Sequence, residues 1–254
     1  MFARRLFLGI ALVLAAVLVG SGGCARREPA ADAPLVVVDA GHGGQFTNHT
    51  GNGLREEELN LDIARRLARL LEARGYRVVM TRDHEGDMGA GAIPTWGRLG
   101  SAEARWTLAV DWPLDARTLA KRRDLQARCD VANSAGAAAF VSIHNNASTS
   151  PRVQGTETFA EYGDEPSLAL AASIVDAAST RAGTLNRREH ESGLYVCRFT
   201  EAPAVVVEGA YLTNEHDARL LRHRRFRQHL AEGIANGIDR WFASYPMPGR
   251  GEVR

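Results

Sequence analysis

Two histidines in this chain stand where a short apolar segment gives way to a turn. His42 follows the run Val36–Asp39 and is flanked by glycines, and His144 directly follows the run Phe140–Ile143. Open α/β sheets bind ligands at the carboxyl ends of their strands, so both imidazoles are expected at one edge of a sheet. Imidazole nitrogens are common zinc ligands, and the two positions therefore indicate a divalent-metal site.

A catalytic zinc usually takes three protein ligands and leaves one position for water, so a third ligand is needed. Glu56, Glu57 and Glu58 are candidates at the start of a predicted helix. Acidic residues there also have a simpler explanation, because each interacts favourably with the helix dipole by about 0.3–1 kcal/mol. Neighbouring helical residues are turned by about 100°, so only one of the three can point into the crevice, and the pattern does not say which.

Another carboxylate, Glu208, ends the apolar run Ala204–Val207. Burying a carboxylate is costly unless it is paired or lies next to a cation, so a glutamate at this place is rarely structural. Glu208 is therefore a candidate functional residue, and the pattern alone does not give its role.

Short apolar segments alternate with amphipathic helices from Leu35 onward. Helical spacing of apolar residues marks the segments 61–71, 168–178 and 226–242. Gly75 is expected to end the first helix, because glycine commonly follows the last helical residue. The expected strands are 35–39, 77–81, 138–143, 155–160, 193–198 and 204–208. We expect one α/β domain over residues 35–243, with a twisted, mostly parallel (mixed) sheet of about six strands and helices on both faces.

Two stretches interrupt this alternation. Residues 84–120 are rich in glycine, proline and tryptophan, and we expect an insertion with some helix around Ser101–Arg105. A loop of that length is unusual in a compact domain, so it either borders the cleft or decorates the surface. The tail 244–254 is expected to be disordered.

Composition excludes one class of partner. The chain has 254 residues, a formal charge of +1 and a hydrophobic content of 45%, and Lys121 is its only lysine. Acidic and basic residues are interspersed, so no basic face indicates nucleic-acid binding. We expect a globular monomer.

The amino terminus is typical of an exported protein. Arg4 and Arg5 precede the apolar run 6–19, which is too short to span a bilayer of about 30 Å and matches a signal peptide over residues 1–23. Cys24 follows two glycines, as in a bacterial lipoprotein processing site, although Ser21 stands where leucine is usual. We expect a periplasmic lipoprotein, anchored through Cys24 and followed by a polar tether over 24–34; ordinary signal cleavage is the alternative.

Two further cysteines remain, and export would permit them to form a disulfide. Cys129 lies on a predicted helix and Cys197 on a predicted strand, both among apolar neighbours. Two buried free thiols are the favoured interpretation, and a single bridge is the alternative.

Four ordered segments resemble the zinc-dependent N-acetylmuramoyl-L-alanine amidases of the bacterial cell wall, the amidase 3 family. The segments are 37–44, 56–61, 142–146 and 203–214, and the resemblance extends from Leu35 to about Phe242. Smaller matches are Thr81-Arg82-Asp83, Arg128 with Ala132-Asn133, and Asn186-Arg187. Asn145 and Tyr211 depart from the family pattern, which commonly has a small residue and Phe there.

The resemblance implies a role for each candidate. The family's glutamate ligand lies in a Glu-x-x-Leu-Asn-Leu pattern, which selects Glu56 as the third zinc ligand beside His42 and His144. Glu208 matches the catalytic glutamate. Arg82 and Arg187 are expected to hold peptide carboxylates, Asn146 to contact substrate, and Ser142 and Asn146 to orient ligands.

The implied activity is zinc-dependent hydrolysis of the amide between N-acetylmuramic acid and L-alanine in peptidoglycan, for wall remodelling or cell separation. Two alternatives remain at this point: a zinc peptidase acting on wall peptides, and a non-catalytic wall-binding lipoprotein on the same scaffold. The same metal chemistry serves the amidase and the peptidase, so the sequence does not separate them.

Overall fold

A computed structural model of the chain describes residues 29–47, 50–85 and 115–245. The signal peptide, Cys24, the helix expected around Ser101–Arg105 and the last nine residues of the tail lie outside these ranges. The elements are β1 (Leu35–Ala40), β2 (Thr50–Gly51), β3 (Leu54–Arg55), α1 (Glu56–Ala73), β4 (Arg77–Met80), α3 (Ala116–Ala135), β5 (Ala139–Asn146), β6 (Thr156–Ala160), α4 (Glu165–Ala182), β7 (Asn186–Glu191), α5 (Tyr195–Arg198), β8 (Ala204–Tyr211), α6 (Glu215–Arg222) and α7 (Arg224–Ser244).

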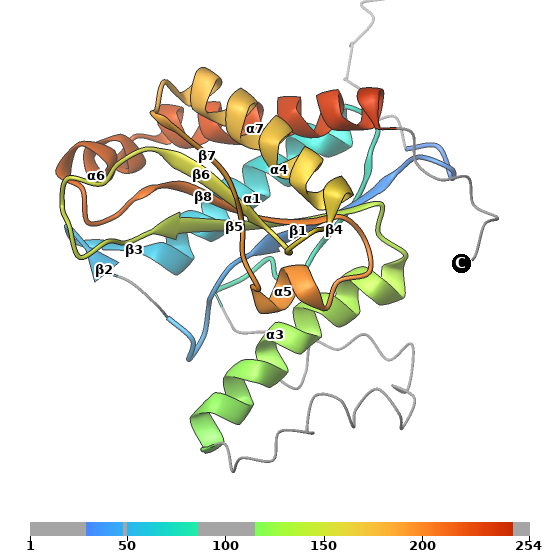
Figure 1. Cartoon of the computed structure of the whole chain (residues 1–254), viewed down its shortest axis with the longest axis horizontal. Helices are drawn as coiled ribbons and strands as arrows, with labels where there is room; N and C mark the ends of the chain where they lie inside the picture. Colours follow the sequence, from blue (N-terminus) through green and yellow to red (C-terminus); the bar gives the residue numbers. More distant parts are fainter. Residues whose placement is uncertain (1–28, 48–49, 86–114, 246–254) are drawn as a thin grey trace, which may run out of the picture.

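The central sheet has six strands in the order β4-β1-β5-β8-β6-β7 (Figure 1). β1 pairs in parallel with β4 and β5, and β5 pairs in parallel with β8. Only the β6–β8 pair is antiparallel among these ladders, and β7 extends the sheet in parallel with β6. The expected mixed, mostly parallel sheet is thus confirmed, and the carboxyl ends of β1, β5 and β8 lie together at one edge.

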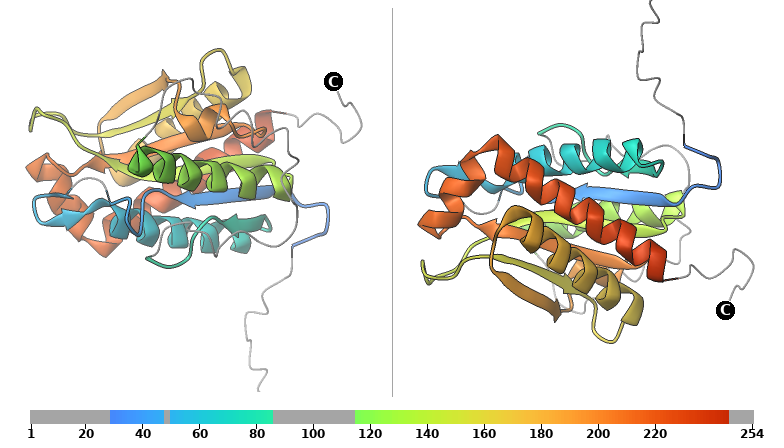
Figure 2. Two further views of the ribbon diagram at one scale, coloured as in Figure 1. Left: turned by 90° about the horizontal axis from the view of Figure 1, so that it is seen from below. Right: turned by 90° about the horizontal axis from the view of Figure 1, so that it is seen from above.

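Helices cover both faces of the sheet, as expected (Figure 2). Alternate residues of one strand face the two sides: Val36 and Val38 pack with α1, α4 and α7, whereas Val37 packs with α3 and α5. All three valines are fully buried. Burial on both faces explains why the central strands are almost continuously apolar rather than alternating.

One expected strand is wrong. Residues 193–198 contain the single-turn helix α5, and the edge strand is β7 at Asn186–Glu191. β7 pairs only with β6 and exposes most of its side chains, so its sequence carries no apolar alternation. The apolar side chains of Val196 and Cys197 instead pack from the helical turn onto the core.

The predicted insertion ends earlier than expected. Asp115 caps helix α3 by accepting a hydrogen bond from the Thr118 amide, so residues 116–120 belong to this helix. Helix α1 ends as the position of Gly75 predicts, with that glycine at φ +90°. Cys129 and Cys197 are buried and free, which confirms the favoured interpretation.

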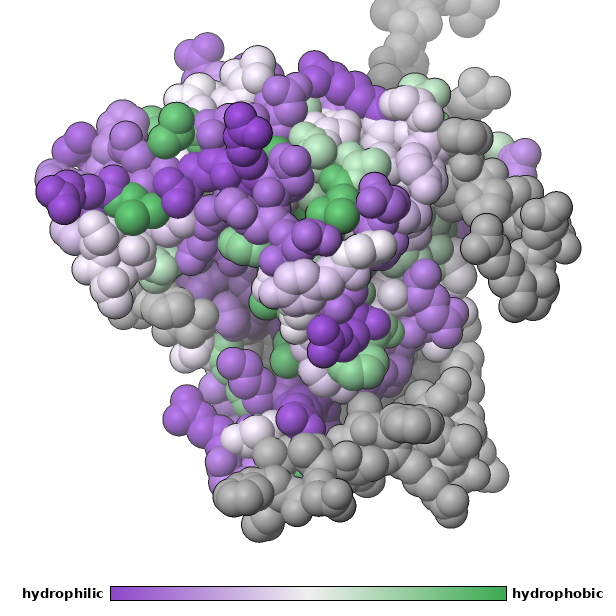
Figure 3. Space-filling view, viewed as in Figure 1, coloured by the Kyte–Doolittle hydropathy of each residue, from purple (hydrophilic) through white to green (hydrophobic). Residues whose placement is uncertain are grey.

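The surface is that of a polar globular domain. On the face seen in Figure 3 hydrophilic residues predominate, and apolar residues lie singly or in small groups. Exposed large apolar side chains are Tyr162, Leu185 and Phe199. Within the described ranges, no helix has the length and apolar character needed to cross a bilayer.

Candidate metal centre

The turn after β1 carries the first predicted ligand in an unusual backbone conformation. His42 has φ +59°, in the left-handed region that residues other than glycine rarely occupy. Gly43 and Gly44 also have positive φ. Gly41 lies against the ring of His144, where an added Cβ would stand 2.1 Å from Nε2. The glycines therefore serve two purposes: they permit the turn, and they let the two histidines approach each other.

The three glutamates at the start of α1 have different partners. Glu56 is 1% exposed and its carboxylate faces both histidines, with Oε1 lying 3.3 Å from His42 Nε2 and 3.0 Å from His144 Nδ1. Glu57 and Glu58 pair instead with Arg55, at 2.6 and 2.8 Å. Of the three carboxylates, only Glu56 therefore contacts the histidines.

His42, Glu56 and His144 form a compact set of possible ligands. One ligand atom from each lies within 4.8 Å of the others, and the two rings meet edge to face with centroids 4.6 Å apart. Two imidazoles and one carboxylate are a usual donor set for catalytic zinc, and three protein ligands leave a coordination position open. The residues present thus fit a zinc ion.

The electrostatics of the cluster favour a negative Glu56. Burial alone would raise the pKa of Glu56, but hydrogen bonds with His144 and His42 hold it well below its usual range. Burial and the charge of His144 lower the pKa of His42. Burial also opposes charge on His144, yet its hydrogen bond to Glu56 and the charge of Glu208 leave its pKa raised.

Glu208 lies beside the ligand cluster on β8. It stands opposite His144 of β5 in the strand register, and opposite Glu157 of β6 on its other side. Burial, together with the negative charges of Glu56 and Glu157, raises the pKa of Glu208 to about 7. Its Oε2 is buried and accepts no hydrogen bond from the residues that the structure describes. The carboxyl group is therefore placed to hold or release a proton near neutrality.

The expected substrate contacts Asn146 and Arg187 both turn toward Glu157. Asn146 donates to its Oε1 at 2.7 Å, Arg187 donates to its Oε2 at 3.1 Å, and the Tyr211 hydroxyl donates to Oε1. The Arg187 side chain is 33% exposed and lies over the Tyr211 ring. Glu157 was not singled out from the sequence, although a glutamate within a short predicted strand was an available signal.

Arg82 does not fit its expected contact with a peptide carboxylate. It is 2% exposed, and its guanidinium donates to four backbone carbonyls, those of Ala40, Gly41, Glu57 and His84. Four of the five N–H donors of the guanidinium are thus occupied by backbone carbonyls. Arg82, which follows β4, therefore contacts the backbone that precedes His42 and the backbone at the start of α1.

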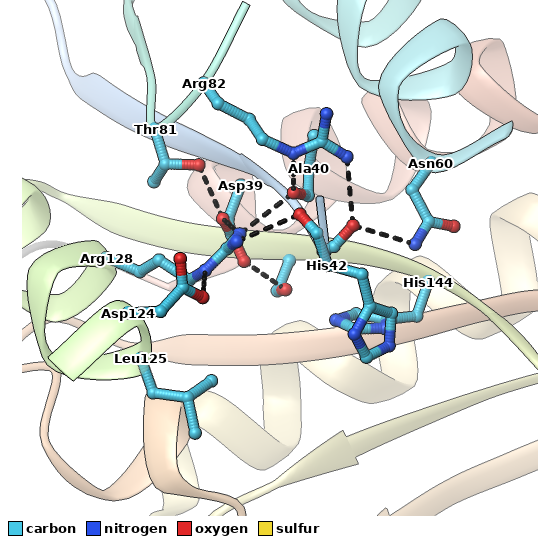
Figure 4. A network of polar contacts seen from close by, with 12 residues as sticks. Asp39, Ala40, His42, Asn60, Thr81, Arg82, Asp124, Leu125, Arg128 and His144 are labelled. Atoms are coloured by element: carbon cyan, nitrogen blue, oxygen red, sulfur yellow. Dashed lines mark hydrogen bonds and ion pairs between the residues drawn. The ribbon is translucent and has the colours of Figure 1, made fainter. Parts of the chain in front are cut away.

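A buried charge network supports the same turn (Figure 4). Asp39 accepts hydrogen bonds from Thr81, Ser142 and Arg128, which hold its pKa below the usual range against the opposing effect of burial. Arg128 also donates to the carbonyls of Ala40 and His42. Ser142, expected to orient ligands without touching the metal itself, donates to Asp39 of this network.

A cavity of about 240 Å³ opens beside His42. Its lining includes Phe46 and Thr47, which follow His42 in the loop after β1, and Arg117, Thr118 and Lys121 from α3. Arg117 and Lys121 form no ion pair with the residues that the structure describes. The cavity next to the ligand cluster is therefore bordered by two cations available to an anionic group.

Comparison with known proteins identifies the family of this chain. A family model described as N-acetylmuramoyl-L-alanine amidase (Amidase_3) matches residues 36–240. The amidase LytC of Bacillus subtilis is 30% identical over 204 residues, which cover 80% of this chain and 34% of LytC. The chain thus spans about a third of that relative, whereas its match to YqiI of the same organism, at 29% identity, covers 94% of YqiI.

Solved structures give the same fold. The amidase AmiC2 of Nostoc punctiforme superposes with a TM-score of 0.64 at 29% identity, covering 83% of this chain and 97% of AmiC2. An amidase from Clostridium difficile superposes with a TM-score of 0.67 at 24% identity, covering 84% and 98%. The prediction that the chain is an amide-hydrolysing enzyme of this class is confirmed by the family match. This chain therefore belongs to the Amidase_3 family of N-acetylmuramoyl-L-alanine amidases.

Proposed function

We propose that this chain is a zinc-dependent hydrolase that cleaves the amide between N-acetylmuramic acid and L-alanine in peptidoglycan, during wall remodelling or cell separation. The observation that carries the proposal is the convergence of His42, Glu56 and His144, whose ligand atoms lie within 4.8 Å of one another. Family membership supports the choice of this amide bond and of peptidoglycan as the substrate.

In this proposal, His42, Glu56 and His144 hold the metal, and Glu208 handles the proton. Zinc bound there would supply a Lewis acid that polarises a carbonyl and makes water acidic near neutral pH. Glu208 Oε2 takes the proton from the attacking water and later gives it to the nitrogen of the departing amine. The pKa of Glu208, raised by burial to about 7 in the metal-free site, supports this double role, because a carboxyl group with a raised pKa both accepts and releases a proton near neutral pH.

The substrate is proposed to lie across the sheet edge between the metal cluster and Glu157. Arg187 retains exposed surface beside Glu157 and could meet a peptide carboxylate, while Asn146 borders the same edge. The cavity beside His42, with Arg117 and Lys121 on its wall, offers a second place for an anionic part of the wall peptide.

We further propose that the protein works outside the cytoplasm as a monomer, held to a membrane by lipid at Cys24. The amino-terminal sequence and the wall-directed family support export. Labelling of the expressed protein with a radioactive or clickable fatty acid tests the anchor, since Cys24→Ser should abolish incorporation. Incorporation unaffected by that change would contradict the anchor.

Digestion of purified peptidoglycan tests the activity. Sacculi are incubated with the protein, with and without a chelator, and the released fragments are identified by mass spectrometry. Free stem peptides beginning with L-alanine, formed only when metal is available, are expected. Cleavage within the stem peptide would instead indicate a peptidase, and metal-replete protein that releases nothing would indicate a binding scaffold.

A further inference from the structure

Asn60 contacts all three segments that carry the proposed ligands. It is fully buried on α1, one helical turn after Glu56. Its Nδ2 donates to the Gly41 carbonyl at 3.1 Å and lies 3.3 Å from Glu56 Oε1, and its Oδ1 accepts from Asn145 Nδ2 at 2.9 Å. Since Gly41 precedes His42 and Asn145 follows His144, one amide connects the surroundings of all three ligands.

Asn145 stands where the family pattern commonly has a small residue. Its side chain is 1% exposed and points to Asn60 rather than to solvent. The residue that departs from the family pattern is therefore part of the same internal arrangement.

Arg82 makes a second connection between two of the segments. Its Nε donates to the Ala40 carbonyl at 2.8 Å, and its Nη2 donates to Gly41 at 3.0 Å and to Glu57 at 2.9 Å. Ala40 and Gly41 lead directly into His42, and Glu57 follows Glu56. One guanidinium thus joins the end of β1 to the start of α1.

The backbone of His42 explains why such connections are needed. Its φ of +59° is unfavourable for a residue with a side chain, and such a conformation persists only where the surrounding structure holds it. The preceding carbonyls, those of Ala40 and Gly41, accept from Arg82 and Asn60 (Figure 4). Without these hydrogen bonds the turn could relax and move the imidazole away from Glu56.

We infer that Asn60 and Arg82 are positioning residues that assemble His42, Glu56 and His144 before a metal ion binds. The inference rests on the proposed zinc site and adds residues that touch neither metal nor substrate. Residues that orient metal ligands commonly contribute 10–100-fold to metal affinity. Loss of either side chain should therefore weaken zinc binding while leaving the fold intact.

The test compares zinc affinity among Asn60→Leu, Arg82→Lys and a matched control. Asn60→Leu keeps the approximate size but removes the amide, and Arg82→Lys keeps the charge but removes the planar guanidinium. Arg227→Lys is the control, because Arg227, like Arg82, donates to backbone carbonyls, here those of Leu221 and Arg222. It also donates to Asp62, and all of these partners lie outside the ligand cluster.

Two quantities are measured on each full-length protein: the zinc dissociation constant, by competition with a chromophoric chelator, and the Tm of the metal-free form. We expect the zinc Kd to rise about 10–100-fold for Asn60→Leu and Arg82→Lys and to stay within about threefold for Arg227→Lys. Excess zinc should restore much of the amidase kcat, because the defect lies in metal occupancy.

If Asn60→Leu does not fold, Asn145→Ala replaces it, since this change removes only the contact between Asn60 and the His144 segment. A smaller rise in Kd is then expected. Folded variants whose zinc Kd stays within threefold of the unaltered protein would overturn the inference, as would an equal rise in Arg227→Lys. An unaltered protein that binds no zinc would refute the proposed metal site instead.

Discussion

Replacement of Glu208 by glutamine is the most direct test of the proposed chemistry. Glutamine keeps the shape of the side chain but cannot carry the proton, and Glu208 is not among the three proposed ligands. Removal of a general acid–base group commonly costs about 10²–10⁴ in rate, which corresponds to about 3–5 kcal/mol of transition-state stabilisation. We therefore expect kcat to fall by this factor while zinc content is unchanged.

The pH profile adds a second, independent signature. Burial and neighbouring carboxylates raise the pKa of Glu208 to about 7, so the carboxylate that takes the proton is present above this pH and is lost as pH falls below it. A bound dication would favour the charged form and move the limb to lower pH. The unaltered enzyme should thus lose kcat/KM on the acid side at or below about pH 7, and Glu208→Gln should lack that limb.

The assay follows release of soluble fragments from labelled peptidoglycan at several pH values, with zinc content measured on the same samples. Glu157→Gln serves as a comparison, because it removes a neighbouring negative charge that raises the pKa of Glu208 but leaves the Glu208 carboxyl group in place. A Glu208→Gln protein that holds zinc and digests peptidoglycan at near wild-type rate would refute the reasoning, and so would an acid limb that survives the substitution.

Other substitutions separate metal binding from stability. His144→Ala should reduce bound zinc, measured by elemental analysis, to background, and a full equivalent of metal would contradict its role as a ligand. Gly41→Ala should weaken zinc binding at least tenfold in a chelator competition, because an added Cβ would stand 2.1 Å from the His144 ring; unchanged affinity would mean that the turn can move aside. Gly237→Ala should lower the Tm of the metal-free protein, because the added Cβ would stand 2.5 Å from the Ile174 backbone. Overpacking costs about 1–3 kcal/mol, which exceeds the stabilisation that alanine gives over glycine in a helix. Zinc affinity should not change, and a rise in Tm would contradict this reasoning. Lys121→Glu should raise KM for peptidoglycan without altering zinc content if the cavity beside His42 takes an anionic group, and an unchanged KM would exclude it.

Sequence patterns were reliable where the chemistry depends on the ends of buried strands. Apolar runs that lead to His42, His144 and Glu208 identify the central parallel strands, and the carboxyl ends of these strands are where the three side chains meet. Sequence patterns were unreliable for the outermost strand, β7, because its side chains are mostly exposed and show no alternation of apolar and polar residues. Its polar sequence is typical of a loop.

The sequence by itself determined the fold class, the helical and central strand segments, and the residue types of the candidate metal centre. Only the tertiary structure separated Glu56 from Glu57 and Glu58 by direct contact, because that choice depends on which side of the first turn of α1 faces His42 and His144. The structure also decided the roles of Arg82 and Asn60, whose partners are backbone carbonyls and amides far along the chain. Such partners carry no sequence signal, since every residue has the same backbone groups and only folding brings particular ones within reach.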